Sequence, residues 1–267
     1  MKLETITQEG LWLCLLHGGM SEAIDWIQPA SVNVIMTSPP YKDEDGFSLA
    51  LMRDLGRLAV HVLKPGGRVF MNFGQLRENF NRPYVARDLV QVGARLGLKA
   101  GQTIAWIKSV VIDEKQRGHY QPITMKSPTL NYCWESIFTF YKPPEAGLDR
   151  LSIGVPFADK SNMERGSRGS NGDLHCAGDA WFIPYKTTGA TKKKGAAELK
   201  GAYSYPEEVV ERCLKVSDLQ PGAVVLDPFV GGGTTVSVAR RLGFNSIAVD
   251  MNKVALEVTQ RAWEGVQ

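Results

Sequence analysis

Strand-length apolar runs alternate with helical patterns in both end regions of this chain, whereas its middle shows neither. The first region has strand patterns over residues 11–16, 32–37, 68–73 and 102–107, with helical patterns over 21–27, 49–63 and 84–96. The last region has helical patterns over residues 206–216, 234–242 and 252–262, with strand patterns over 223–226 and 246–250. This alternation predicts an α/β fold with a Rossmann-like, doubly wound and mostly parallel sheet.

The middle of the chain interrupts this rhythm. A strand pattern over residues 134–141 is followed by a segment, residues 142–201, that is rich in Gly, Ser, Asn, Pro and Lys. A structureless loop of this length is uncommon in a compact domain unless it has a function or is ordered by a partner. We therefore predict two halves of one α/β domain, 1–141 and 202–267, around a recognition insertion at 142–201. The alternative is a disordered surface loop.

Composition limits the possible functions only mildly. The chain has 267 residues, 43% apolar and 22% charged, and its net charge of +3 permits a polyanionic partner without requiring one. Its four cysteines form no CxxC pair and its four histidines show no ligand spacing, so we expect free thiols and no metal site. There is no apolar leader and no apolar stretch of about 20 residues, which predicts a cytoplasmic protein without a membrane partner.

The segment Ser38-Pro39-Pro40-Tyr41 follows directly on the apolar run at residues 32–37. Two successive prolines remove two N–H groups and fix φ, so the chain must leave the sheet as a rigid hook. The Ser38 hydroxyl and the Pro39 carbonyl can accept both protons of an amino group on a planar base, while Tyr41 stacks on the ring. The alternative interpretation is a proline-capped turn that only ends the strand.

A second motif, Asp227-Pro228-Phe229-Val230-Gly231-Gly232-Gly233-Thr234-Thr235, joins a predicted strand to a predicted helix. Its glycines allow a ligand to approach the backbone closely, and the helix N-terminus offers free N–H groups. It lacks the lysine of a phosphate-binding P-loop and does not match GxGxxG. The next strand ends at Asp250, where a carboxylate can accept from ribose hydroxyls, so the motif indicates a nucleoside-type ligand.

The two motifs, in this order, resemble those of beta-class S-adenosylmethionine-dependent DNA amino-methyltransferases. Residues 62–67, 134–138 and 202–206 also resemble family motifs. The resemblance implies a circularly permuted class I methyltransferase fold with S-adenosyl-L-methionine as cofactor. It implies catalytic roles for Ser38, Pro39, Pro40 and Tyr41, and a cofactor site formed by Tyr205, Pro206, Asp227, Pro228, Phe229, Gly231, Gly233, Thr234 and Asp250.

One position departs from the family pattern. The family usually ends a strand in Gly-Asp, and this acid helps to hold the cofactor adenine, whereas the present chain has Gly18-Gly19. We expect a backbone group or Asp25 to take over this contact. We also expect Ser21 to cap the helix that follows.

The resemblance implies transfer of the cofactor's methyl group to adenine N6 or cytosine N4 of a base that is flipped out of duplex DNA. A serine at the first motif position is often found in N4-cytosine enzymes of the family, yet any residue that accepts the proton serves either base. The absence of a Pro-Cys motif argues against C5-cytosine methylation. Two alternatives remain open: methylation of RNA or of a protein amide, and a non-catalytic DNA-binding module on the same fold.

Basic residues in the insertion are candidates for phosphate contacts. They are Arg165, Arg168, Lys186, Lys192, Lys193 and Lys194. Taken alone, the lysine run is typical of a solvated charged loop, but in a chain with this resemblance we expect it to contact DNA. The expected partner is double-stranded DNA. The resemblance further implies a possible homodimer and, if a cognate restriction endonuclease exists, a separate chain for it.

Overall fold

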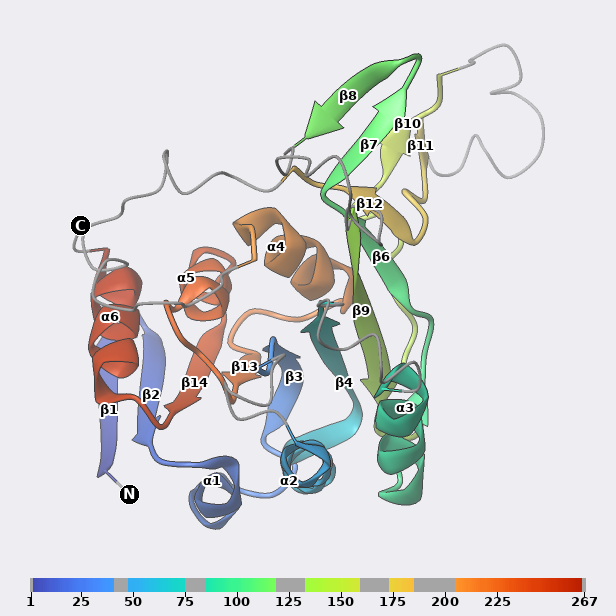
Figure 1. Cartoon of the computed structure of the whole chain (residues 1–267). Coiled ribbons are helices and arrows are strands. Elements are labelled where there is room, and N and C mark those ends of the chain that lie inside the picture. Colours follow the sequence, from blue (N-terminus) through green and yellow to red (C-terminus); the bar gives the residue numbers. More distant parts are fainter. Residues whose placement is uncertain are drawn as a thin grey trace, which may run out of the picture.

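A computed structural model of the chain describes residues 2–40, 48–74, 85–118, 133–158, 173–184 and 205–265. In these residues ten strands form one sheet (Figure 1). Its order is β1 (Lys2–Gln8), β2 (Leu11–His17), β14 (Asn245–Asp250), β13 (Val224–Asp227), β3 (Val32–Thr37), β4 (Leu63–Phe73), β9 (Trp134–Tyr141), β6 (Ile104–Ile107) and β12 (Ala180–Phe182). The tenth strand, β5 (Lys99–Ala100), pairs with β9.

Most neighbours in the sheet are parallel. The exceptions in the described part are the edge strand β1, which is antiparallel to β2, and β9, which is antiparallel to β4, β5 and β6. Two small ribbons stand apart from the sheet, β7 (Ser109–Ile112) with β8 (Lys115–Gly118), and β10 (Val155–Pro156) with β11 (Leu174–His175). The predicted doubly wound, mostly parallel α/β fold is therefore confirmed.

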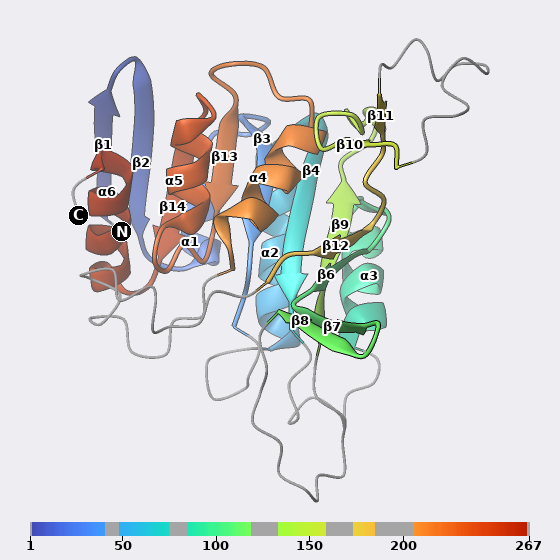
Figure 2. The same cartoon turned by 90° about the horizontal axis from the view of Figure 1, so that it is seen from above.

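Helices cover both faces of the sheet (Figure 2). One layer contains α1 (Met20–Trp26), α2 (Leu49–Val62) and α3 (Val85–Arg95), and the other contains α4 (Glu207–Val216), α5 (Thr234–Arg241) and α6 (Lys253–Glu264). Neighbouring residues of one strand face opposite layers: Ile35 packs in the cluster that holds Leu58 of α2, whereas Met36 packs in the cluster that holds Val210 of α4. Burial on both faces explains why these central strands are almost entirely apolar.

The two sequence halves interleave at the centre of the sheet. β13 from the C-terminal half pairs in parallel with β3 from the N-terminal half, with Val225 opposite Val34 and Leu226 opposite Ile35. Both strands therefore end at the same edge of the sheet, so Ser38 and the glycine motif follow neighbouring strands. An edge of this kind, where strand order changes direction, is where open α/β sheets bind ligands.

Several element limits differ from those predicted by the sequence. The helix cap is Gly19 and not Ser21, because α1 begins at Met20 and the Glu22 side chain accepts from the Gly19 N–H at 2.8 Å. β1 is not apparent in the sequence pattern because its side chains are largely exposed. β12, which falls within the 142–201 segment, joins the main sheet through parallel pairing with β6.

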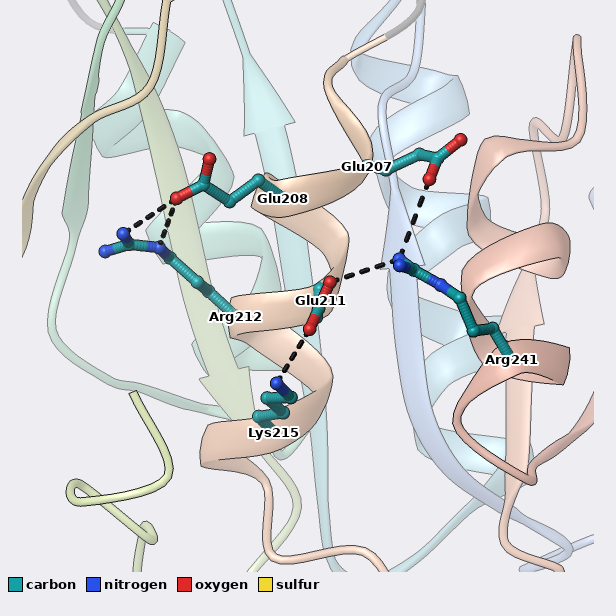
Figure 3. Close-up of polar contacts among 6 residues, drawn as sticks. All are labelled: Glu207, Glu208, Glu211, Arg212, Lys215 and Arg241. Carbon is teal, nitrogen blue, oxygen red and sulfur yellow. Dashed lines mark hydrogen bonds and ion pairs between the residues drawn. The ribbon is translucent and has the colours of Figure 1, made fainter. Parts of the chain in front are cut away.

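Ion pairs tie α4 to α5 on the surface (Figure 3). Arg241 of α5 lies 3.1 Å from Glu211 and 3.6 Å from Glu207, and Glu211 also pairs with Lys215 at 2.7 Å. The hydrogen bond from Lys215 and the charge of Arg241 keep the pKa of Glu211 below its ordinary value. Because Arg241 is half exposed, each of its pairs contributes only about 0.2–1 kcal/mol to stability.

The described residues contain neither a membrane-spanning helix nor a cluster of metal-ligand side chains. None of their helices is both long and apolar enough to cross a membrane. Nor do the same ranges contain a group of three or more His, Cys, Asp or Glu side chains that could hold a metal ion.

Candidate active site

The proline hook leaves the sheet directly after β3. Thr37, the last residue of β3, is fully buried, Pro39 is buried, and Ser38 and Pro40 are half-buried. The hook therefore begins in the core and reaches the carboxyl edge of the sheet. Tyr41 lies outside the described residues, as do all six basic residues predicted to contact DNA.

Asp227 connects the hook to the glycine turn. It is the last residue of β13 and is 2% exposed, and its Oδ1 accepts from the Thr37 hydroxyl at 2.8 Å and from the Phe229 N–H at 3.1 Å. Its Oδ2 accepts from Thr235 at 2.6 Å and from the Tyr205 hydroxyl at 3.2 Å. One carboxylate thus holds four segments of the chain together at the site.

Burial changes the acidity of two groups in this network. It raises the pKa of Asp227 to about 6, even though donors from Thr235, Thr37, Phe229 and Tyr205 favour the charged form. Burial, followed by the nearby Asp227 charge, also raises the pKa of Tyr205 well above its ordinary value. Tyr205 therefore keeps its hydroxyl proton at neutral pH and donates it in the hydrogen bond to Asp227.

The glycine turn presents backbone rather than side chains. Gly231 and Gly233 have φ values of +50° and +79°, and Gly233 starts α5 without a side-chain cap. A Cβ at Gly233 would lie 2.9 Å from the Cα of Thr259 in α6, whereas no atom lies within 4 Å of a Cβ built at Gly232. The turn is thus closed toward α6 and open at Gly232, where a ligand can approach the backbone and the helix N-terminus.

Asp250 is held in a fixed orientation beside this turn. It ends β14, and its two carboxylate oxygens accept from the Gly231 N–H at 3.0 Å and from the Asn252 N–H at 2.8 Å. The Asp250 carbonyl accepts from the Gly18 N–H at 3.1 Å, which fixes the end of β2 next to it. The structure therefore brings together the turn, Asp250 and the Gly18-Gly19 segment at one edge.

At Gly19, where the family usually has an aspartate, the nearest carboxylate belongs to Glu22. Its Oε2 accepts from the Gly19 N–H at 2.8 Å, so an acid does lie at this strand end, supplied from the first turn of α1. Asp25 was the side chain predicted for this contact, and Glu22 was not predicted. The available signal was the spacing of three residues between a cap position and a glutamate, which is typical of a capping box.

The structure brings Asp250 to the glycine turn at Gly231, and it brings Tyr205 to Asp227. Thr37, which directly precedes Ser38, meets Asp227 across 190 residues of sequence. Pro206 is half-buried directly before α4, Pro228 and Phe229 begin the turn, and Thr234 opens α5. The edge therefore combines an acceptor pair at Ser38 and Pro39 with an open backbone turn and a fixed carboxylate. That donor and acceptor set fits a nucleoside beside a planar amino group.

Comparison with known proteins gives a consistent result. A family model described as DNA methylase matches residues 32–261. The type II methyltransferase M.BglII of Bacillus subtilis is 25% identical over 252 residues, which cover 88% of this chain and 64% of that protein. M2.LlaDCHI of Lactococcus lactis subsp. cremoris is 28% identical over 267 residues, 92% of this chain and 87% of its own length.

Solved structures agree at the level of the fold. The DNA modification methylase TTHA0409 of Thermus thermophilus, in complex with S-adenosyl-L-methionine, superposes with a TM-score of 0.60 at 22% identity. That match covers 94% of this chain and 95% of the other. The cytosine-N4-specific PvuII DNA methyltransferase gives a TM-score of 0.64 at 16% identity, covering 95% and 93% of the two chains.

Proposed function

Because the chain belongs to the N6/N4 family of DNA methylases, we propose that it transfers a methyl group from S-adenosylmethionine to an exocyclic amino group of duplex DNA. The observation that carries this proposal is the hydrogen bond of 2.8 Å between Thr37 and Asp227. It links the segment that would grip the amino group to the turn that would hold the methyl donor. Methyl transfer requires such proximity, because it is a direct displacement dominated by positioning.

The described residues fit the proposed cofactor. Asp250 would accept from the ribose hydroxyls, the open backbone around Gly232 would lie against the nucleoside, and the Tyr205-Pro206 segment would close the methionine end. Glu22 is the acid that would replace the missing aspartate at Gly19 near the adenine. When bound, the cofactor supplies a methyl sulfonium, which is an electrophile that needs no further activation by the protein.

The protein would act on the nucleophile. An exocyclic base nitrogen is conjugated with its ring, and hydrogen bonds from its two N–H groups to Ser38 and the Pro39 carbonyl would make its lone pair available. The nitrogen would bond to the methyl group as the bond from methyl to sulfur breaks, and the methylated nitrogen would then lose one proton to solvent. In duplex DNA the base must first be flipped out, which costs a few kcal/mol. Stacking on Tyr41 would offset about 1–3 kcal/mol of this amount.

We assign recognition of the DNA to the 142–201 segment. The basic residues Arg165, Arg168, Lys186, Lys192, Lys193 and Lys194 would contact phosphates there. The same proposal includes a catalytic half, 1–141, and a cofactor-binding half, 202–267, on either side of this segment. It also includes a homodimeric state and, if a cognate endonuclease exists, a separate chain for it.

The test is a direct identification of the product. Duplex DNA of mixed sequence is incubated with the protein and S-adenosylmethionine that carries an isotopically labelled methyl group, then digested to deoxynucleosides and analysed by mass spectrometry. We expect labelled N4-methyldeoxycytidine or N6-methyldeoxyadenosine. A label found in 5-methyldeoxycytidine, or only in RNA or protein offered in parallel, would contradict the proposal.

A serine pair provides the matched control. Ser38→Ala should lower kcat by on the order of 100-fold without changing cofactor affinity in calorimetry, because it removes one proton acceptor at the hook. Ser31 precedes the same strand at its other end, where its hydroxyl donates to the Gln28 carbonyl at 2.7 Å. Ser31→Ala should leave kcat unchanged, and failure of the unmodified protein to bind the cofactor would favour a non-catalytic module.

A further inference from the structure

Three polar side chains from neighbouring strands form a cluster at the carboxyl edge of the sheet. Asn72 of β4 donates through Nδ2 to Glu135 Oε2 at 2.8 Å, and Lys108, which follows β6, donates through Nζ to Glu135 Oε1 at 2.5 Å. The side chains of Lys108 and Glu135 are 21% and 14% exposed, and Asn72 is 2% exposed. The Lys108 ammonium also lies 5.5 Å from the ring centroid of Trp106. We call this group the edge cluster.

The edge cluster lies next to the proline hook. Thr37 at the end of β3 is the register partner of Met71 in β4, so the following residues, Ser38 and Asn72, are neighbours across this strand pair. Adjacent strands are about 4.8 Å apart. Asn72 is therefore one strand spacing from the residue proposed to grip the target amino group.

The edge cluster lies on the side of the sheet that faces α4. Residues two positions apart in a strand share a face, and Asn72 and Glu135 lie two positions from Phe70 and Ile137 of one buried cluster. The same cluster contains Trp106, over which the Lys108 ammonium lies, and Met36, which precedes the hook by two residues. Tyr205, which we assign to the segment that closes the methionine end of the cofactor, packs in that same buried cluster.

A gain in stability is a weak explanation for such a pair. Taking a lysine and a carboxylate out of water involves a desolvation penalty that their attraction often only matches. An ammonium has three N–H bonds, and Glu135 accepts one of them. A target base can accept a hydrogen bond from another of these N–H bonds, because a ring nitrogen with a lone pair lies beside the exocyclic amino group in both adenine and cytosine.

We propose that Lys108 donates a hydrogen bond to this ring nitrogen and that Glu135 and Asn72 position its ammonium. Lys108 is then a specificity-determining residue, and the proposal rests on the function proposed above. Guanine and thymine carry a hydrogen on the corresponding ring nitrogen, so the ammonium would meet a donor instead of an acceptor. The edge cluster thus excludes bases that lack the required acceptor.

The experiment removes the acceptor from the DNA and the donor from the protein, separately and together. The methylated site is first located by sequencing, and a short duplex is made with 1-deazaadenine or 3-deazacytosine at the target, according to the product found. We expect the unmodified protein to methylate this analogue about 10–100-fold more slowly than the natural base, as for loss of a hydrogen bond to a charged group. Lys108→Met should methylate the natural base about as slowly as the unmodified protein methylates the analogue. Its rate on the analogue should be only slightly lower still.

Calorimetry with S-adenosylmethionine checks that each variant keeps its cofactor site. Lys99→Met is the matched control, since Lys99 is an exposed lysine of β5 opposite Tyr141, at the other end of β9. Lys99→Met should methylate the analogue more slowly than the natural base by the same factor as the unmodified protein does. Glu135→Gln removes the charge that orients Lys108. Its discrimination between the natural base and the analogue should lie between that of the unmodified protein and that of Lys108→Met.

Equal rates of the unmodified protein on the natural base and the analogue would overturn the proposal, whether or not any variant folds. So would a Lys108→Met protein that still distinguishes the two bases as strongly as the unmodified protein does. If the unmodified protein yields no methylated nucleoside at all, it is the proposed function that fails, and this result precedes the use of any analogue.

Discussion

At the scale of single residues, Asp227 is the group whose titration should be visible in the stability of the protein. Its pKa in the folded protein is about 6, above the ordinary value of 3.8, because burial disfavours the charged form. The folded state therefore keeps this proton over a pH range in which the unfolded state has lost it. The stabilisation is complete below about pH 4, decreases as the pH rises to about 6, and is absent above that.

We predict that the free energy of unfolding of the unmodified protein, relative to Asp227→Asn, falls by on the order of 3 kcal/mol between pH 4 and pH 7. Urea unfolding at a series of pH values measures it. Asp218→Asn is the control, because Asp218 is exposed and its φ of +49° is one that asparagine accepts. Parallel curves for the unmodified protein and Asp227→Asn would show that Asp227 does not titrate in this range.

Single residues also mark the limit of what the sequence predicts about the site. Ser38 and Asp250 were predicted because Ser38 follows a recognisable strand and Asp250 ends one, and the family match confirms the resemblance that rested on their motifs. The partners of Asp227 were not predicted, since Thr37 is 190 residues away and nothing local indicates that the two meet. The edge cluster was not predicted for the same reason, because its residues come from β4, from β9 and from the position after β6.

At the scale of elements, the turn between β13 and α5 depends on glycine at one position and much less at its neighbour. Gly233 has a φ of +79°, and an added Cβ would lie 2.9 Å from backbone of α6, whereas Gly232 has open space. We predict that Gly233→Ala destabilises the protein by about 1–3 kcal/mol through strain and displacement of α6. Thermal or urea unfolding should show a much smaller change for Gly232→Ala, and equal losses would contradict the assigned role of the turn.

The Gly232→Ala variant separates stability from ligand contact. Its added methyl group would project into the space that we assign to the cofactor, so calorimetry should show weaker binding of S-adenosylmethionine despite a nearly unchanged unfolding curve. Unchanged cofactor affinity would place the nucleoside elsewhere along this edge.

Elements were predicted best where burial imposes a pattern. The limits of β3 and β9 match those predicted, because both strands are buried runs between clear turn signals. β1 was missed because exposed edge strands need no apolar pattern, and β12 was missed because only three residues pair with β6. Short edge strands owe their conformation to the neighbour they pair with rather than to their own sequence.

At the scale of the whole molecule, stability should decrease from the centre of the sheet toward its edge. β13 and β14 are buried on both faces and paired on both sides, whereas β1 pairs only with β2 and is mostly exposed. We predict that amides of β13 and β14 exchange with solvent only through global unfolding, and those of β1 exchange through local opening. Hydrogen exchange followed by mass spectrometry tests this, and equal protection of β1 and β13 would argue against it.

The position of β13 between β14 and β3 also constrains how the protein can be assembled. Because β2 and β3 touch only β14 and β13 on their inner sides, the N-terminal part of the sheet has a gap until residues 224–250 have been synthesised. Contacts between such distant segments close slowly, since the entropy of a long loop must be lost first. A nascent chain on the ribosome therefore carries the proline hook for most of its synthesis without β13, the strand that brings Asp227 and the glycine turn beside it.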